Sequence, residues 1–384
     1  MAHGSRGYVC GMSLAVSPFE NFYSVIPAGG IGSRLWPLSR ADAPKFLHDL
    51  TGSGQTLLRD TWDRLGPLSG EDRIMVVTGR AHRAAVEEQL PELEDRNVVL
   101  ESEPKDSSAA IGLAAAILVN REPDVIIGSF AADHVIKDTR GFRRAVQESI
   151  AAARAGYIAT IGITPTEPAI GFGYIHCAGP LEIEGAPSAV AVQAFVEKPD
   201  VATAKRYVED GAHLWNGGMF IARADVLLEQ MAKSEPALVA GLRELADAWD
   251  TPRRGAVVDR IWPSLPKIAI DYTVAEPAAA AGRLVVVPGD FDWDDVGDFA
   301  SIAKLHSGGR KSDLAILGEN ARVLADASTG VVISQSGRLI SLIGVNDIVV
   351  VDTPDALLVT TTANAQRVKS VVDALKLSGR DDVL

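Results

Sequence analysis

The chain has 384 residues, which is enough for about two domains with a sizeable hydrophobic core. Hydrophobic residues make up 47% and charged residues 23%, a balance that excludes a wholly disordered chain. The 50 Asp and Glu outnumber the 37 Lys and Arg, and the net charge of -13 argues against nucleic acid or an anionic membrane as the partner. A small anionic substrate is still compatible, because the charge around one site can oppose the charge of the whole.

The N-terminal segment and the cysteines bear on the cellular compartment. Residues 1–20 contain no sustained apolar stretch, so we expect a disordered lead-in and not a signal peptide. The longest apolar run, residues 111–119, is too short to span a bilayer. Two cysteines, Cys10 and Cys177, cannot build a disulfide framework or a cysteine-rich metal site. We therefore expect a reducing, cytoplasmic location.

Short apolar runs alternate with amphipathic stretches from residue 21 to residue 306. The expected strands cover residues 22–26, 74–78, 97–100, 124–130 and 158–163, and the expected helices cover 57–65, 80–90, 107–121 and 139–155. Ser107 and Ser108 are suited to cap the third helix. The alternation predicts an α/β domain, residues 21–306, with a buried parallel sheet and helices on both faces. Ligands of such sheets bind beyond the carboxyl ends of the strands.

The pattern changes near residue 310. Five short strands without a long helix between them are expected at residues 320–323, 330–334, 339–343, 347–351 and 356–359. Residues 313–384 therefore form a small C-terminal β-rich domain, built as a solenoid of imperfect turns. Its closing helix places Val368, Val371, Val372 and Leu375 on one apolar stripe. The boundary between the domains is expected in residues 307–312.

The strongest local feature follows the first strand. Residues 27–40 read Pro-Ala-Gly-Gly-Ile-Gly-Ser-Arg-Leu-Trp-Pro-Leu-Ser-Arg, and a Pro-Lys pair follows at residues 44–45. Glycines let backbone N–H groups approach an anion closely. Arg34, Arg40 and Lys45 against Asp42 give a local charge of +2 in an acidic protein. The alternative is an ordinary tight turn with surface cations, since the spacing matches neither the dinucleotide-binding fingerprint nor the Walker loop.

Two acidic regions are candidates for a magnesium site. Asp133 follows an apolar strand, so its carboxylate lies at the carboxyl end of the sheet, where it either holds Mg²⁺ or only stabilises a turn. Five aspartates between residues 290 and 298 offer a second ligand, from Asp292, Asp294 or Asp295. Trp293 among them indicates a packed turn and not an open acidic loop.

Three further positions have both a functional and a structural interpretation. Glu197 and Lys198 end the strand expected at residues 191–196, either as substrate contacts or as a surface ion pair. Asn216 precedes two glycines, and is either a hairpin turn residue or a substrate contact. Gly173 permits a close approach of its backbone to a substrate, or marks a simple bulge.

These motifs resemble those of the sugar-1-phosphate nucleotidylyltransferases, and they occur in the same order along the chain. Within that family, they are most similar to the motifs of the mannose-1-phosphate guanylyltransferases. The resemblance covers about residues 22–306. Besides the glycine-rich loop, it is carried by Ala131-Ala-Asp-His134, Gly171-Phe-Gly-Tyr174, Phe195-Val-Glu-Lys-Pro199, Trp215-Asn-Gly-Gly-Met-Phe220, Ile270-Asp271 and Asp290-Phe-Asp-Trp-Asp-Asp-Val-Gly297. It implies a Rossmann-like mixed, mostly parallel sheet flanked by helices, the nucleotidyltransferase fold. The C-terminal domain is then expected to be left-handed β-helix-like and to end in a helix.

The resemblance also implies a reaction and its residues. The reaction is transfer of GMP from GTP to mannose 1-phosphate, giving GDP-mannose and pyrophosphate, with Mg²⁺ as cofactor. The implied catalytic residues are Arg34, Lys45, Asp133, Lys198 and Asp295. The implied nucleotide-binding residues are Ala28, Gly29, Gly30, Gly32, Ser33, Arg34, Lys45, Lys105, Ser107 and Asp133. The implied sugar-phosphate contacts are Gly173, Glu197, Lys198 and Asn216. The implied metal ligands are Asp133 and Asp295, with Asp294 as the alternative to the second.

The chemistry needs no activated nucleophile. A sugar phosphate is already an anion, so alignment and charge neutralisation suffice, and we expect His134 to be structural and not a general base. One segment departs from the family pattern, because Lys105-Asp106-Ser107 stands where Arg-Asn-Thr is common. This change loses a planar guanidinium, and either Glu101 or Glu103 corresponds to the glutamate of the family.

Several alternatives stay open. The chain could use another base or sugar, or be a catalytically silent paralogue that senses nucleotide sugars; retention of Arg34, Lys45 and Asp133 argues against the silent form. A homodimer is an open possibility for the assembly. Some relatives carry an added phosphomannose isomerase domain, for which this chain is too short, so we expect a single activity.

Overall fold

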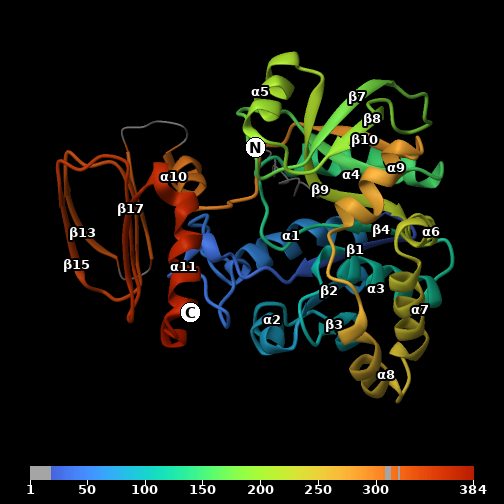
Figure 1. The fold of residues 1–384 in the computed structure, drawn as a ribbon, viewed down its shortest axis with the longest axis horizontal. Coiled ribbons are helices and arrows are strands. Elements are labelled where there is room, and N and C mark those ends of the chain that lie inside the picture. Colours follow the sequence, from blue (N-terminus) through green and yellow to red (C-terminus); the bar gives the residue numbers. More distant parts are fainter. Residues whose placement is uncertain (1–18, 308–312, 319–320) are drawn as a thin grey trace, which may run out of the picture.

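The computed structural model describes residues 19–307, 313–318 and 321–384. The expected lead-in therefore lies outside the described residues except for Phe19 and Glu20, and so does the expected boundary segment except for Ser307. Figure 1 shows the α/β domain with the C-terminal β-rich domain beside it. The domain bounds, with the α/β domain ending at residue 306 and the β-rich domain beginning at residue 313, stay a prediction. Within the described ranges, no helix is long and apolar enough to cross a membrane.

One nine-stranded sheet forms the centre of the α/β domain. Its strands are β1 Phe22–Ala28, β2 Ile74–Gly79, β3 Val98–Glu101, β4 Ile126–Ser129, β6 Ile158–Ile163, β7 Tyr174–Pro180, β8 Val190–Val196, β9 His213–Arg223 and β10 Leu284–Gly289. They lie in the order β3-β2-β1-β4-β9-β6-β10-β8-β7. Strands β1 to β4 pair in parallel, as do β6 and β10, whereas β9 is antiparallel to its neighbours β4, β6 and β7. The expected mixed, mostly parallel sheet is confirmed.

Helices cover both faces of the sheet, as the apolar strands require (Figure 1). They are α1 Leu57–Ser69, α2 Arg83–Gln89, α3 Asp106–Arg121, α4 Thr139–Arg154, α5 Val201–Asp210, α6 Ala224–Ser234, α7 Pro236–Trp249, α8 Arg254–Ile261, α9 Glu276–Ala280 and α10 Phe299–Ser307. The alternating side chains of β1 show the two cores. Tyr23 and Val25 pack in the cluster that contains α3 and α7, and Phe22 and Ile26 pack in the opposite cluster with α1 and α4.

The C-terminal domain is β-helix-like. Its elements are β12 Leu314–Leu317, β13 Arg322–Asp326, β14 Gly330–Ser334, β15 Leu339–Ile343, β16 Ile348–Asp352, β17 Leu357–Thr361 and the closing α11 Val368–Leu377. Successive coils stack in parallel, β12 on β14 on β16 and β13 on β15, and β17 returns antiparallel to β16. Val368 and Val372 are buried as the expected stripe requires, but Val371 is 39% exposed.

One local expectation is wrong, and one of two alternatives is excluded. Ser107 and Ser108 do not cap α3, whose N-cap is Lys105 without a side-chain hydrogen bond, because both hydroxyls bond elsewhere, to the Ile270 N–H and to Thr273. Asn216 is not a hairpin turn residue, because it lies inside β9. The glycines after it are accommodated by a register shift against β6 between Thr160 and Gly162.

Candidate active site

The glycine-rich loop leaves the carboxyl end of β1 and folds back on Lys45. Ala28 is the last residue of β1, and Gly29 and Gly30 follow it. Gly32 has φ +75°, and a Cβ at this position would lie 2.6 Å from Cβ of Lys45, so only glycine fits. The Lys45 N–H donates to the Ile31 carbonyl at 3.2 Å. The loop therefore sets its backbone directly against the lysine.

Cations of two kinds border the loop. Arg34 lies in the short 3-10 turn Ser33–Leu35, is exposed, and has no hydrogen-bond or ion-pair partner among the described residues. Lys45 is buried. Its ammonium donates to Asp133 Oδ2 at 2.8 Å and also to the main-chain carbonyl of Asp295. Lys45 thus joins the glycine-rich loop to both acidic regions.

The two acidic regions meet at this lysine. Asp133 follows β4, and Asp295 follows β11 Trp293–Asp294, which pairs with β5 Val135–Ile136 just after Asp133. Burial alone would raise the pKa of Asp133, but the charge and hydrogen bond of Lys45 outweigh it and the pKa is lowered. The pKa of Asp295 is raised to about 6 by burial and by the nearby carboxylates of Asp294 and Asp133.

The carboxylate of the neighbouring Asp294 stabilises the turn. Its Oδ1 accepts a hydrogen bond from the Val296 N–H at 2.7 Å, which closes the turn. His134 is also structural in this arrangement. Burial, followed by repulsion from Lys45 and Arg64, lowers its pKa to about 4, so the imidazole is neutral near pH 7. Its ring packs edge-on against Trp293, with centroids 5.3 Å apart.

The glycine-rich loop, Lys45, Asp133 and Asp295 are called the nucleotide half-site below. Asp133 and Asp295 are the two carboxylates of this set, and the described residues contain no group of three or more His, Cys, Asp or Glu that could hold a metal ion. Mg²⁺ commonly takes one or two protein carboxylates and fills its other positions with water and substrate phosphates. The donor set fits such an ion, and the raised pKa of Asp295 marks an excess of negative charge that a cation would relieve.

A second group of polar residues forms what we call the sugar half-site: Gly173, Glu197, Lys198, Asn216 and Asp271. Asn216 holds it together. Its N–H donates to the Gly173 carbonyl at 2.8 Å, its Nδ2 donates to Asp271 Oδ1 at 3.0 Å, and its Oδ1 accepts from Thr160 Oγ1 at 2.8 Å. Glu197 Oε2 lies 2.6 Å from the place of a Cβ on Gly173, so a side chain there would collide with it.

The charges of the sugar half-site are partly balanced. Glu197 pairs with the exposed ammonium of Lys198 at 2.5 Å. Burial alone would lower the pKa of Lys198, but its contacts with Glu197 outweigh this and the pKa is raised. Burial and the charge of Glu197 raise the pKa of Asp271 to about 6.

An aromatic chain connects the two half-sites. Phe172 packs edge-on against Trp215 and Trp293, with centroids 5.1 and 5.4 Å apart, and Trp293 contacts His134 in turn. The segment before Gly173 is thereby fixed to the acidic turn before Asp295. The structure thus brings the residues expected for phosphate, metal and sugar to one connected region at the carboxyl ends of the central strands.

Lys105 and Ser107, expected at the base pocket, have their polar atoms engaged elsewhere. The Lys105 ammonium bonds to the Pro263 carbonyl and to Glu103, both at 2.8 Å. The Ser107 hydroxyl accepts the N–H of Ile270, next to Asp271. Both residues thus fasten the segment before α3 to the segment that supplies Asp271.

Sequence reasoning missed two residues of this region. Asp271 was noted only as part of a family motif, and its bond to Asn216 joins positions 55 residues apart. Glu101 is buried at the end of β3, its Oε2 lies 3.6 Å from the place of a Cβ on Gly29, and its Oε1 has no partner within the described ranges. Burial and Asp106 raise the pKa of Glu101 to about 7. The glutamate in the family pattern was the available signal, but two candidates competed for it.

Comparisons with known proteins bear on the fold and the family of the chain. A family model described as nucleotidyl transferase matches residues 23–311, and one described as a MannoseP isomerase/GMP-like beta-helix domain matches residues 321–375. The Xanthan biosynthesis protein XanB of Xanthomonas campestris pv. campestris (strain B100) is 36% identical over 364 residues, 93% of this chain and 74% of that protein. A mannose-1-phosphate guanylyltransferase of Escherichia coli (strain K12) is 36% identical over 368 residues, 94% of this chain and 75% of that protein.

A solved structure is similar over both domains. It is described as a mannose-1-phosphate geranyltransferase from Thermus thermophilus, and it matches with a TM-score of 0.81 at 30% identity, covering 93% of this chain and 99% of that one. Fold, family models and relatives agree over nearly the whole chain. The chain therefore belongs to the nucleotidyl transferase family and carries the GMP-like β-helix domain at its C-terminal end.

Proposed function

We propose that the protein transfers GMP from GTP to mannose 1-phosphate, releasing pyrophosphate and forming GDP-mannose. A phosphate oxygen of mannose 1-phosphate attacks the α-phosphorus in line, and the bond from that phosphorus to the oxygen bridging to the β-phosphate breaks. The observation that carries the proposal is the meeting of Lys45, Asp133 and the Asp295 turn beside a glycine-rich loop, connected to a polar cluster suited to a sugar. Relatives named mannose-1-phosphate guanylyltransferase support the choice of substrates.

The nucleotide half-site binds and orients the triphosphate. A Cβ on Gly30 would have no atom within 4 Å, which leaves space for phosphate oxygens at the loop backbone. Arg34, which has no partner among the described residues, is available to the β- and γ-phosphates. Lys45 is held at Asp133, beside the expected place of the α-phosphate. Asp133 and Asp295 are the residues that would hold Mg²⁺, and Asp294 is less suited because its carboxylate closes the turn. Bound Mg²⁺ supplies Lewis-acid stabilisation of the charge that develops on the phosphate oxygens.

The sugar half-site orients the nucleophile. Glu197, Asn216 and Asp271 present fixed acceptors and donors to sugar hydroxyls, and Gly173 permits a close approach of the ring. Lys198 is the exposed cation of this group and is suited to hold the sugar phosphate. Their fixed arrangement supplies the alignment on which phosphoryl transfer depends.

Glu101 is our candidate for base selection. Guanine presents two adjacent N–H donors on its Watson–Crick edge, whereas adenine presents an acceptor at N1. The pKa of Glu101 is raised to about 7, and two facing N–H donors would favour its ionised form, which can only accept. Glu101 has its Oε2 beside Gly29 and an Oε1 without a partner among the described residues, so its carboxylate suits such donors. We expect Glu101→Gln to reduce the preference for GTP over ATP by about tenfold or more, because an unmatched polar group costs selectivity. The control is Glu103→Gln, the other candidate from the sequence, whose exposed carboxylate pairs with Lys105.

The decisive experiment is a panel of nucleoside triphosphates against a panel of sugar 1-phosphates, scored by pyrophosphate release with Mg²⁺. Fastest release with GTP and mannose 1-phosphate supports the proposal. Preference for another pair assigns a different substrate in the same family, and no release with any pair favours a silent, regulatory relative. The low cysteine content supports a reducing compartment, so we place the reaction in the cytoplasm.

A further inference from the structure

The second half of the glycine-rich loop turns away from the phosphate-binding region. Leu35, Trp36 and Leu38 are buried in an apolar cluster shared with the C-terminal domain. That domain contributes Val331, Ile333, Val349, Val351, Leu358, Val368, Val372 and Val383 to the cluster. Residues 35–40 are therefore packed against the β-rich domain, although residues 29–34 just before them face the substrate side.

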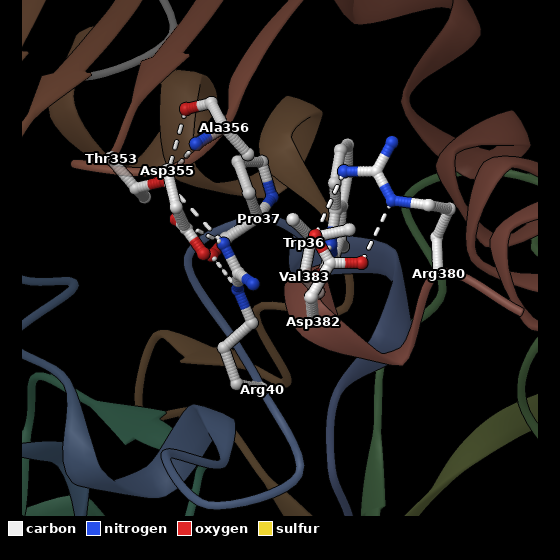
Figure 2. A network of polar contacts seen from close by, with 9 residues as sticks. All are labelled: Trp36, Pro37, Arg40, Thr353, Asp355, Ala356, Arg380, Asp382 and Val383. Carbon is white, nitrogen blue, oxygen red and sulfur yellow. Dashed lines mark hydrogen bonds and ion pairs between the residues drawn. The ribbon is translucent and has the colours of Figure 1, made fainter.

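Two polar contacts fix this packing (Figure 2). The indole N–H of Trp36 donates to the Val383 carbonyl at 2.7 Å in a buried position. The guanidinium of Arg40 donates from Nη2 to Asp355 Oδ1 at 2.8 Å, and from Nε to the carbonyl of Pro37 at 2.7 Å. Arg40 thus links the backbone of its own loop to the C-terminal domain. Its side chain is 13% exposed.

The same domain also reaches the acidic turn. The amide of Gln366 donates to Asp298 Oδ2, three residues after Asp295. The other carboxylate oxygen of Asp298 caps α10 through the N–H groups of Ala300 and Ser301. The C-terminal domain therefore contacts both segments that Lys45 joins, the loop on one side and the acidic turn on the other.

We propose that Arg40 is a positioning residue, and that the C-terminal domain holds the glycine-rich loop in its catalytic geometry through the Arg40–Asp355 pair and the Trp36–Val383 bond. The inference rests on the proposed function. Three cations lie in or near the glycine-rich loop. In this proposal Arg34 and Lys45 bind the substrate, whereas Arg40 binds the C-terminal domain. The Trp-Pro-Leu-Ser-Arg stretch is accordingly a docking segment for the β-rich domain. Alignment of phosphates within about 1 Å is worth up to about 100-fold in rate, so a loop held from behind affects turnover without touching substrate.

The test is a double-mutant cycle on Arg40 and Asp355, measured by steady-state kinetics of pyrophosphate release. We expect Arg40→Ala and Asp355→Ala each to lower kcat/KM for GTP by about threefold to tenfold, and the double variant to lose no more than either alone. The KM for mannose 1-phosphate stays unchanged in all three, because the sugar half-site does not contact this pair. Asp355→Glu, which keeps the charge, recovers most of the loss.

A matched ion pair supplies the control. Arg121 and Asp250 also lie 2.8 Å apart, with side chains 17% and 56% exposed against 13% and 47% for Arg40 and Asp355, but they join α3 to the end of α7. Asp250→Ala is expected to keep the wild-type kinetic constants, whatever its effect on the unfolding midpoint. If Asp250→Ala lowers kcat/KM for GTP as much as Asp355→Ala does, the loss follows from reduced stability and the proposal is overturned.

Two other outcomes also overturn it. If Asp355→Ala has wild-type kinetics while Arg40→Ala is strongly impaired, Arg40 contacts phosphate directly. If the losses of the single variants add in the double variant, the two residues do not act through one another. Failure of the proposed function is distinguishable from these, since it leaves the wild-type protein without pyrophosphate release from GTP and mannose 1-phosphate.

Discussion

The nucleotide half-site and the sugar half-site each set one lysine ammonium against two carboxylates, and in each one carboxyl has its pKa raised to about 6, but the two differ in how their polar groups are held. In the nucleotide half-site, one buried ammonium faces the carboxylate of Asp133 and the raised-pKa carboxylate of Asp295, so the negative charge is incompletely compensated. In the sugar half-site, the Asn216 side chain bonds Thr160 through Oδ1 and Asp271 through one hydrogen of Nδ2, which fixes its orientation, and the second Nδ2 hydrogen takes no part in these bonds. One region is thus prepared to receive a cation with its phosphates, and the other to receive a neutral ring by shape and hydrogen bonding.

This difference explains how a protein of net charge -13 can act on two anions. The acids that make the total charge negative include those suited to hold a metal, and phosphate would bind to that metal and to Arg34, Lys45 and Lys198. In the proposed function each half-site binds a different substrate, so the contrast predicts separate kinetic signatures for the two.

The largest expected effect comes from the charge of the nucleotide half-site. We expect Asp133→Asn to lower kcat by about 1,000-fold or more, because a preorganised charge at the reacting phosphate is lost. The unfolding midpoint should stay within about 2 °C of the wild type, since Asn keeps the shape and an acceptor for Lys45. Steady-state kinetics and thermal unfolding check the two statements. Undiminished turnover in this variant would remove Asp133 from the metal site.

In the same half-site, a substitution at Gly32 should lower kcat nearly as much. Gly32→Ala places a methyl group 2.6 Å from Cβ of Lys45, at φ +75°, so the lysine or the loop must shift. We expect kcat to fall about 100-fold, the size associated with a displacement of about 1 Å. The matched control is Gly54→Ala, which has φ +83° but no atom within 4 Å, and so carries the backbone strain without the collision. Equal losses in the two variants would show that strain and not the position of Lys45 is responsible.

In the sugar half-site, the effect should fall on one substrate. Lys198→Ala removes the exposed cation, and we expect KM for mannose 1-phosphate to rise about 10- to 100-fold, the range of a charged hydrogen bond, while KM for GTP stays unchanged. Lys205→Ala, an exposed lysine of the nearby α5, is the control. A selective loss of GTP binding in Lys198→Ala would reverse the assignment of the two half-sites.

Much of this arrangement is readable from the sequence, for physical reasons. Strand runs and glycine-rich loops are local, so β6, β14 and β15 have the predicted ends and Asp133 follows its strand as expected. Asn216 was ambiguous because an Asn-Gly pair favours turns locally, whereas the pairing of β9 with β6 decides its place in the sheet. The role of Arg40 and Trp36 could not be read at all, since their partners lie 315 and 347 residues away in the chain.

The smallest expected effect concerns stability and pH. The pKa of Asp271 is raised to about 6 in the folded protein, against about 3.9 in the unfolded chain. Ionisation of Asp271 therefore lowers the free energy of unfolding. This loss increases from pH 4 to pH 6 and is fully present above pH 6. We expect Asp271→Asn to raise the unfolding midpoint by about 1–3 °C at pH 8 and not at pH 4.

An aspartate whose pKa is shifted in the opposite direction provides the comparison. The hydrogen bonds from Arg223 lower the pKa of Asp225, so its ionised form stabilises the fold above pH 4. Asp225→Asn should therefore lower the unfolding midpoint at pH 8. A midpoint for Asp271→Asn that falls at pH 8, as in Asp225→Asn, would show that Asp271 is stabilising in its ionised form.

The aromatic chain from His134 through Trp293 and Phe172 to Trp215 has an optical consequence. An indole changes its fluorescence when the polarity around it changes, and the two half-buried or buried indoles of this chain flank the two half-sites. The other four tryptophans are buried and supply the remaining emission: Trp62, Trp249 and Trp262 lie in the two cores, and Trp36 packs against the C-terminal domain. The order in which nucleotide and sugar phosphate arrive can therefore be followed in the natural emission of the protein, without a label.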